Sequence, residues 1–473
     1  MSTEELYQQR LQRYTTALRG GKPDRVPIRP FAAEFVAKNC GMTCQDVTQD
    51  YDRAFEAVIR TCKDFGWDAA VANMVYVWGG IPQQVNLRYF AIPGVGLSPG
   101  TGFQYLEPPE DETFMREDEY DALIEDPTGF LYNVWLPRVS RDVVRPGEPA
   151  TLRNNLSFLK GAFSMMDYFN AFPGQVKRMR EEAGTVSAIA GILKAPMDIL
   201  ADKMRGYLGL CADLMERPEK VLRACEAMQP HLFHVANATA DPAGQVPVGL
   251  WMHRGCVPLV SFDHFHNMYW ATLKPIVLEL WKRGHQTLFY AEGKWGAHLK
   301  TFADDLPEGS IVYHCDRDDI FAVHRALGHK FCISGGIENA MLAYGKPADV
   351  RARVRQVIET VGRDGGYIMD AGAIIQNDAS IENVRAMTEA TMEFGEYSSS
   401  SGGGRAGVAP AAVAHACGIP VTPAHRPPGT VQPWGQKKGE MPAMTGDEGM
   451  VRATWERYDG WANAYIWQLL LSF

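Results

Sequence analysis

The chain has 473 residues, of which 46% are hydrophobic and 22% charged, a composition typical of one large globular domain with additions or of two domains. A formal net charge of -9, without basic runs, argues against a nucleic-acid partner, because phosphate binding requires clustered Lys and Arg. The polar N-terminus lacks the apolar core of a signal peptide, and no apolar stretch approaches the ~20 residues that span a membrane. Nine scattered cysteines without a CxxC pair favour a cytoplasmic protein, and we expect an enzyme.

Strand and helix patterns alternate along most of the chain. Apolar residues at helical spacing predict a helix over residues 3–20, and a second predicted helix covers about 49–65. The predicted strands begin near residues 26, 68, 186, 246, 286, 311, 331 and 366, most of them separated by helical patterns. Eight β–α units predict an α/β protein with a closed (β/α)8 TIM barrel, and a doubly wound open sheet is the second choice. No GxGxxG or Walker motif follows any of these strands, so a Rossmann nucleotide site is not supported.

Composition divides the chain into three predicted parts. The barrel covers residues 1–397, with an inserted lid or rim at about 73–185, where the pattern blurs into Gly, Pro, aromatic and acidic residues. Residues 398–446 are rich in Gly, Pro and Ser and predict an arm or linker. Residues 447–473 predict a helix so aromatic that it must bury itself, either on its own barrel or on a second subunit. A homo-oligomer that forms through this segment is one hypothesis.

The chemistry of such a barrel lies at the carboxyl ends of its strands, which directs attention to the polar residues there. The strand near 311 ends in His314-Cys-Asp316, and the neighbouring strand near 286 ends in Glu292. His314, Asp316 and Glu292 could converge as an acid–base set, or as ligands of a divalent metal such as zinc. The alternatives are a strand end that meets water or caps the next helix through Asp316, and an ion pair of Glu292 with Arg254 or Lys294.

The strand near 246 ends in Trp251-Met-His253-Arg254, which supplies candidate substrate-binding residues. His253 and Arg254 would suit an anionic group of a substrate, although a polar layer at the barrel rim explains them equally well. Trp251 and Trp295 could line an apolar pocket, although tryptophans at such spacing are more often part of the core.

One motif and three pairs of motifs occur in a characteristic order: Ala17-Leu-Arg-Gly-Gly-Lys-Pro-Asp-Arg-Val-Pro27; Ala195-Pro-Met-Asp-Ile-Leu200 with Arg205-Gly206; Gly335-Gly-Ile337 with Tyr344-Gly-Lys-Pro347; and Gly365-Gly-Tyr-Ile368 with Glu382-Asn-Val-Arg-Ala-Met387. Over residues 10–397 this order resembles the uroporphyrinogen decarboxylase superfamily, more its branch of cobalamin-dependent methyltransferases than the true decarboxylases. The resemblance implies the same (β/α)8 barrel.

The resemblance also bears on the chemistry. True uroporphyrinogen decarboxylases carry an Arg-Gln-Ala-Gly-Arg loop after the first strand, whereas this chain has Arg29-Pro-Phe-Ala-Ala-Glu34, so decarboxylation of a tetrapyrrole is not expected. The thiol-activating methyltransferases bind zinc through His-x-Cys and a later Cys. His314 matches the histidine, but Asp316 and Ala373 stand at the cysteine positions, which leaves a harder set suited to oxygen, water or acid–base chemistry.

The resemblance therefore implies a corrinoid-dependent methyltransferase that moves a methyl group between a small molecule and cobalamin. The chain has no Asp-x-His-x-x-Gly signature, so the cobalamin is expected on a separate corrinoid carrier protein. One alternative is a cofactor-independent decarboxylase or lyase that holds a small carboxylate with His253 and Arg254. A non-catalytic binding or scaffold protein is the third hypothesis, and the predicted convergence of polar residues makes it the least favoured.

Overall fold

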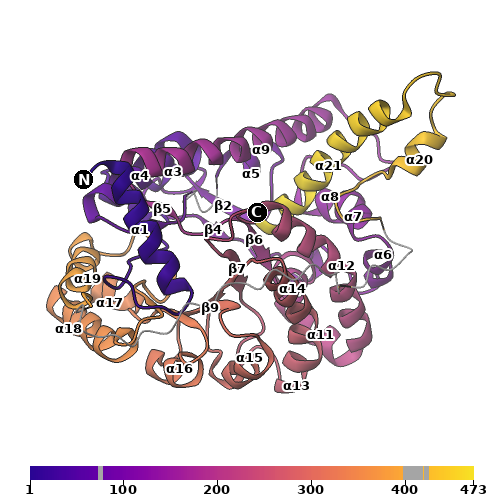
Figure 1. The fold of residues 1–473 in the computed structure, drawn as a ribbon. Helices are drawn as coiled ribbons and strands as arrows, with labels where there is room; N and C mark the ends of the chain where they lie inside the picture. Colours follow the sequence, from indigo (N-terminus) through magenta and orange to yellow (C-terminus); the bar gives the residue numbers. More distant parts are fainter. Residues whose placement is uncertain (73–77, 398–418, 420–425, 473) are drawn as a thin grey trace.

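A computed structural model describes residues 1–472 except 73–77, 398–418 and 420–425. Its central feature is a ring of parallel strands (Figure 1). Six strands pair in one sheet in the order β11-β10-β9-β8-β7-β6, and β1 pairs with β5. The bounds of these strands are β1 Ala69–Ala70, β5 Val186–Ser187, β6 Ile192–Lys194, β7 Val248–Met252, β8 Thr287–Ala291, β9 Ile311–Cys315, β10 Cys332–Gly335 and β11 Tyr367–Ile368.

Backbone hydrogen bonds close the two sheets into one barrel. Ile28, in the segment 26–31, forms a parallel bridge with Met369 next to β11, and its carbonyl accepts the amides of Asp68 and Ala69 at 3.0 and 3.2 Å. On the other side, β5 and β6 belong to one interrupted strand region, which pairs with β1 through Val186 and with β7 through Ile192. The (β/α)8 barrel is confirmed, and the open-sheet alternative is wrong because the first strand region joins the last.

Helices follow each strand and form the outer layer of the barrel. In chain order they are α2 Phe35–Asn39, α3 Cys44–Gln49, α4 Tyr51–Phe65, α9 Leu152–Arg178, α10 Pro196–Ile199, α11 Tyr207–Glu216, α12 Pro218–Thr239, α13 Phe262–His264, α14 Ala271–Lys282, α15 Leu299–Asp305, α16 Ile320–Leu327, α17 Asn339–Tyr344, α18 Pro347–Val357 and α19 Ile381–Phe394. Four π-helical turns are continuous with these helices. The turn η3 Met179–Ala183 follows α9, η4 Leu200–Met204 follows α10, η5 Phe265–Trp270 joins α13 to α14, and η7 Ile358–Gly362 follows α18. Local sequence sets several ends: Gly66 ends α4 in a left-handed conformation (φ 68°), and the Asp319 carboxylate caps α16.

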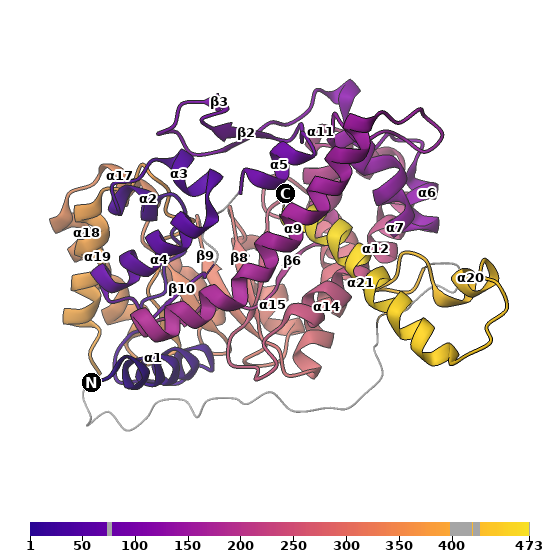
Figure 2. The same cartoon turned by 90° about the horizontal axis from the view of Figure 1, so that it is seen from above.

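The residues inserted between β1 and α9 form a separate layer at one edge of the barrel (Figure 2). They include a small sheet with the strand order β3-β2-β4, which does not pair with the barrel strands among the described residues. The elements are α5 Gly80–Gln84, β2 Phe90–Pro93, β3 Gly96–Leu97, β4 Gln104–Tyr105, η1 Glu110–Glu112, α6 Tyr120–Glu125, α7 Pro127–Phe130, η2 Leu131–Trp135 and α8 Leu136–Val139. The ammonium of Lys203, in η4, lies 3.9 Å from the ring centroid of Tyr89, which anchors this layer beside the third strand region.

The C-terminal residues fold as α20 Trp434–Gly439 and α21 Glu448–Ser472. The second half of α21 is buried against its own chain, where Trp467 stacks on His231 with 4.9 Å between ring centroids and donates its indole N–H to the Thr128 hydroxyl. The first half exposes Tyr458 and Trp461. Most of the predicted arm lies outside the described residues, and the predicted domain boundaries stay a prediction.

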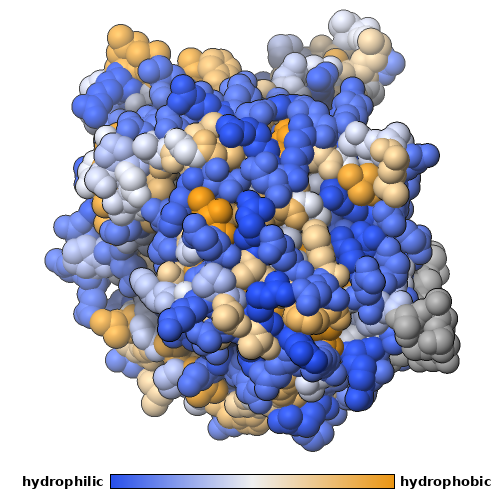
Figure 3. Space-filling model, turned by 90° about the vertical axis from the view of Figure 1, so that its left-hand side faces the viewer, coloured by the Kyte–Doolittle hydropathy of each residue, from blue (hydrophilic) through white to orange (hydrophobic). Residues whose placement is uncertain are grey.

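The surface drawn in Figure 3 is mainly hydrophilic, and its hydrophobic residues form small separate spots. Among the described residues, no helix combines the length and the apolar character that crossing a lipid bilayer requires.

Asp68 ties the amino-terminal helix α1, Thr3–Leu18, to the start of the barrel. Its fully buried carboxylate accepts hydrogen bonds from Arg13 Nη1 at 2.6 Å, from Arg25 Nη1 at 2.8 Å and from the backbone amide of Ile28 at 2.8 Å. Helix α1 and the segment 25–28 thus converge on one side chain. Removing its charge would leave the Arg25 guanidinium without its described counter-ion and would leave Arg13 with Asp24 alone.

We predict that Asp68→Asn lowers the free energy of unfolding by about 3–5 kcal/mol, because a buried ion pair is broken on one side only. Urea denaturation measures this value. Asp304→Asn is the matched control, since Asp304 pairs only with exposed Lys300 among the described contacts, and it should change stability by less than about 0.5 kcal/mol. Equal stabilities of the two variants would contradict the assigned role of Asp68.

Candidate active site at the carboxyl ends of the strands

The strand register sorts the polar residues inside the barrel into two layers. Trp251 on β7 lies level with Tyr290 on β8, and Tyr290 lies level with His314 on β9. Because alternate residues share a face, His253, Glu292 and Asp316 follow on the same inward face one step closer to the carboxyl ends. Two residues along a strand correspond to about 6–7 Å, so His314 lies a full layer below Glu292 and Asp316.

His314 in the lower layer is fully buried and has a partner on each ring nitrogen. Nε2 lies 3.0 Å from the carbonyl oxygen of Gly372, and Nδ1 lies 2.9 Å from Ser334 Oγ. Since a carbonyl only accepts, Nε2 carries the proton, and Nδ1 accepts the serine hydroxyl. Burial, with Arg29 nearby, lowers the pKa of His314 well below its ordinary value, so the ring stays neutral. It is held as a structural and positioning group beneath the mouth of the barrel.

The same layer contains a buried ion pair. Arg29 Nη1 lies 3.4 Å from Asp370 Oδ2, and Arg29 also donates a hydrogen bond to Ser334 Oγ at 2.9 Å. Burial raises the pKa of Asp370 to about 7, against the effect of Arg29. The phenol of Tyr290 stacks on His314 with 4.2 Å between centroids, and its hydroxyl has no hydrogen-bond partner among the described residues.

His253 in the upper layer lies between two carboxylates. Its Nδ1 is 2.8 Å from Asp202 Oδ2, and its Nε2 is 3.5 Å from Glu292 Oε2, too far for a good hydrogen bond. Burial acts to lower the pKa of His253, but Glu292 and Asp202 together raise it above its ordinary value. Nε2 makes no hydrogen bond within the described part of the chain. An imidazolium oriented by one carboxylate, with its other N–H on the Glu292 side and free of a described hydrogen bond, is an arrangement that suits a general acid.

Asp202 holds His253 from a helical turn that follows the third strand region. Burial acts to raise the pKa of Asp202, but His253, Lys194 and Arg254 outweigh it and keep that pKa below its ordinary value. Its neighbour Asp198 accepts the backbone amides of His253 and Arg254, at 3.1 and 2.7 Å, and so fixes the loop that carries the imidazole.

Asp316 and Glu292 occupy the mouth beside His253. Asp316 accepts the backbone amide of Gly293 at 2.8 Å, and burial raises its pKa to about 6. It does not cap the next helix, because Asp319 does so. Glu292 lies near His253 rather than pairing with Lys294 or Arg254 in any described ion pair.

The predicted metal set of His314, Asp316 and Glu292 is not assembled. Both nitrogens of His314 are used within the lower layer, and no group of three or more His, Cys, Asp or Glu side chains is arranged to bind a metal among the described residues. The prediction failed because strand alternation defines a shared face but not a shared level. The residues present do not fit a zinc centre of this composition.

Arg254 forms ion pairs with two carboxylates of its own chain. It donates Nε to Asp202 Oδ1 at 2.7 Å, and its Nη2 lies 3.1 Å from Glu107 of the inserted layer. The residue therefore anchors the insertion to the mouth, which favours the polar-layer interpretation over binding of a substrate anion.

The two predicted tryptophans differ in environment. Trp251 is half-buried, packs against Phe31 and Tyr290, and leaves its indole N–H without a partner among the described residues. Trp295 is fully buried and donates its indole N–H to the carbonyl of Glu292 at 2.9 Å. Trp251 can thus line a substrate site, whereas Trp295 belongs to the core and supports the Glu292 turn.

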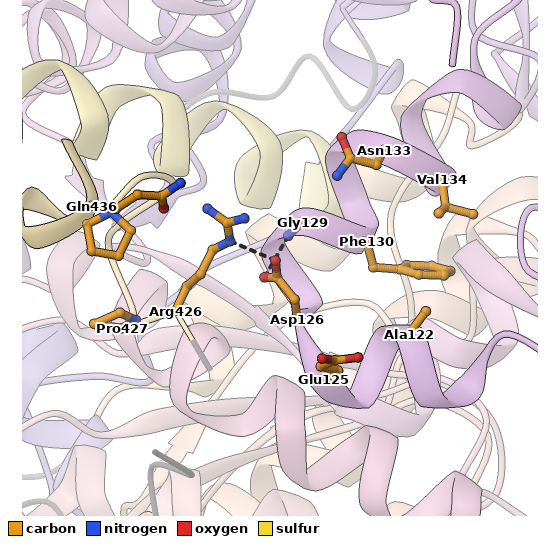
Figure 4. Close-up of a pocket in the computed structure, with 11 residues that line it drawn as sticks. Ala122, Glu125, Asp126, Gly129, Phe130, Asn133, Val134, Arg426, Pro427 and Gln436 are labelled. Atoms are coloured by element: carbon orange, nitrogen blue, oxygen red, sulfur yellow. Dashed lines mark hydrogen bonds and ion pairs between the residues drawn. The ribbon is translucent and has the colours of Figure 1, made fainter. Parts of the chain in front are cut away.

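A separate pocket of about 560 Å³ lies between α6–α7 and residues 426–436, and none of the described barrel strands lines it (Figure 4). Arg426 crosses it and pairs with Asp126 at 2.7 Å, while Asp126 also caps α7. None of the predicted site residues lines it, so the barrel mouth remains the candidate active site.

Comparison with known proteins agrees with the fold and the motifs. The model of the uroporphyrinogen decarboxylase (URO-D) family matches residues 159–394. Uroporphyrinogen decarboxylase of Methylococcus capsulatus is 32% identical over 76 residues, 16% of this chain and 21% of that protein, and the enzyme of Actinobacillus succinogenes is 29% identical over 68 residues, 14% and 19% respectively. The chain thus spans about a fifth of the length of these curated relatives.

A solved structure described as a methyltransferase from Methanosarcina mazei superposes with a TM-score of 0.55 at 14% identity, covering 81% of this chain and 98% of that one. It shows the same fold. The protein is therefore a (β/α)8 barrel of the uroporphyrinogen decarboxylase type. By its family match and its motifs, the chain belongs to the uroporphyrinogen decarboxylase superfamily.

Sequence reasoning missed Asp202, Asp198, Arg29, Asp370 and Tyr290. Asp198 stands inside the Ala195–Leu200 motif, and Arg29 inside the segment compared with the decarboxylase loop, so both had a signal. Asp202 had no such signal, because it contacts His253 across a sequence separation of 51 residues.

We predict that Asp202→Asn and Glu292→Gln each lower the pKa of His253, because each removes a carboxylate that stabilises the imidazolium. The acid dissociation constant of His253 should rise about tenfold or more in each variant. Nuclear magnetic resonance of labelled histidines during a pH titration measures this. Asp316→Asn is the control, since Asp316 is not a principal cause of the raised value. An unchanged pKa of His253 in both variants would refute the assigned electrostatics.

Proposed function

We propose that this chain is a methyltransferase that moves a methyl group between a small-molecule substrate and a cobalamin carried by a separate corrinoid protein. Membership of the superfamily and the likeness to the Methanosarcina mazei methyltransferase support this class. The observation that carries the proposal is the geometry of His253: Asp202 lies 2.8 Å from Nδ1, while Nε2 has no hydrogen bond within the described residues and lies at the barrel mouth.

When a methyl group leaves oxygen, nitrogen or sulfur, the bonding electron pair stays on that atom. A proton donated to the atom neutralises the negative charge that develops there. In the direction from substrate to corrinoid, the carbon–heteroatom bond breaks and the corrinoid, as co-substrate, supplies the acceptor for the methyl group. His253 donates the Nε2 proton to the departing heteroatom and becomes neutral, still hydrogen-bonded to Asp202. Asp202 therefore fixes both the orientation of the ring and the nitrogen that carries the transferable proton.

Asp316 is the other candidate for the general acid, but its pKa leaves it mostly ionised at neutral pH. With a pKa of about 6, roughly a tenth of Asp316 is protonated at pH 7. The raised pKa of His253 keeps a larger fraction of that group charged. Glu292, together with Asp202, then stabilises the imidazolium form of His253.

The wall beside His253 suits a small, partly apolar substrate. Phe31, Trp251 and Tyr290 pack with ring centroids 5.4–5.9 Å apart. Among described residues, the Trp251 indole N–H and the Tyr290 hydroxyl lack partners, so each could bind a polar atom of the substrate. The lyase alternative is less favoured, because Arg254 and His253 already pair with carboxylates.

We predict that purified protein, with a corrinoid acceptor, catalyses methyl transfer from one class among ethers, amines, thioethers and halides. His253→Asn should reduce the rate about 100-fold or more, the usual worth of a general acid, without unfolding the protein. The visible spectrum of cob(I)alamin follows the transfer. Lys300→Gln, a change at an exposed residue whose described ion pair is with Asp304, is the control. Equal rates in His253→Asn and wild type would remove His253 from the mechanism.

The pH dependence of the same reaction gives an independent test. Since the acid form of His253 is the active one and its pKa is raised, the rate should hold at low pH and fall as pH rises through that pKa. Glu292→Gln should move the falling limb to lower pH. A limb that rises with pH instead would assign the group a role as base.

A further inference from the structure

Helix α9 is apolar on two opposite faces. Its inward face buries Gly161, Met165 and Tyr168 against the molecule. A second row points away from the body, and its members remain exposed to 75, 43, 46, 60 and 38%, in the order Leu152, Leu156, Leu159, Phe163 and Met166. At 100° per residue, this row is centred about 180° from Gly161. Single exposed apolar residues are normal on a surface, but five in one continuous row are not.

The spacing of the exposed row specifies the shape of its partner. Steps of 4, 3, 4 and 3 residues separate its five members. This is the seam of a coiled coil, in which a second helix packs alongside. In Figure 2, α9 crosses the near side of the molecule, where a second helix could approach it.

Charge along one edge of the seam identifies the second helix. Arg153, Lys160 and Asp167 follow that edge at intervals of seven residues, and Arg153 and Asp167 lie almost symmetrically about Leu159, the midpoint of the apolar row. A two-fold axis near Leu159 would bring Arg153 of one copy beside Asp167 of another. The opposite edge carries Asn155, Ala162 and Phe169, so a parallel pairing would offer these charges no complement.

We propose that the outward face of α9 is an interface between two copies of this chain, which pair antiparallel about a two-fold axis near Leu159. Arg153 and Asp167 each have one partner in their own chain, Asp142 at 2.8 Å and the Tyr51 hydroxyl at 2.6 Å, and both stay exposed enough to take a second. Lys160 meets its own counterpart near the axis, and its long side chain can turn to solvent. The interface is isologous, as closed dimers require.

Sedimentation velocity of the full chain tests the interface. We expect a dimer, and at least a tenfold weaker association when Leu159→Glu and Phe163→Glu are combined. Leu208→Glu with Met215→Glu, two exposed apolar positions on α11, is the matched control and should leave the dimer intact. Circular dichroism checks that each variant is folded. A monomeric wild type, or a dimer that survives the α9 substitutions, would overturn the proposal.

A charge exchange and a cross-link test the orientation. Arg153→Asp and Asp167→Arg should each weaken the dimer several-fold, and the double variant should recover it, because the pair is restored across the axis. Lys160→Cys should form an intermolecular disulfide under mild oxidation, whereas Lys177→Cys, about three turns beyond the apolar row, should not. Additive losses in the double variant, or cross-linking only at residue 177, would exclude the antiparallel arrangement.

Discussion

The register between β7, β8 and β9 is the constraint on which the candidate site depends. Tyr290 is paired in register with His314, and Trp251 with Tyr290, so these three side chains form one layer. His253, Glu292 and Asp316 are thereby forced together one layer higher. A shift of one residue on any strand would turn its inward set to the helices, and a shift of two would break the layer. The backbone pairing of these strands thus determines which polar side chains lie at the same level of the barrel.

Electrostatics then gives the two layers different properties. The lower layer contains Arg29 beside Asp370, whose pKa burial raises to about 7, and a neutral His314 with a hydrogen-bond partner on each ring nitrogen. The upper layer contains an excess of carboxylates around His253, which stabilises its charged form. Two histidines from strands on either side of β8 are thus held in opposite protonation states, His314 by burial and His253 by its carboxylate neighbours. The neutral one is fixed in place, whereas the charged one retains a nitrogen that can act on a substrate.

Much of the fold could be predicted because short segments of the sequence determine the strands and the helix ends. Apolar runs marked the eight strand regions, and residues such as Gly66 marked helix ends through their conformational preference. The site was harder, since alternation shows which face His314 and Asp316 share but not whether they share a level with Glu292. Asp202 could not be assigned, because its role depends on a contact between distant segments. Trp295 was misassigned because only packing against Phe265 and His298 distinguishes a core tryptophan from a lining one.

The insertion links the barrel mouth to the outer surface. At its inner side, Glu107 pairs with Arg254, and Tyr89 covers the Lys203 ammonium. At its end, α9 is the helix of the second β–α unit, and its Phe158 lies 6.0 Å from Tyr465 of α21 between ring centroids. The same segment therefore shapes the rim near His253 and presents the exposed row on α9. A second copy bound at that row would restrain the insertion from outside, which lowers the conformational freedom of the rim without contacting the reacting groups.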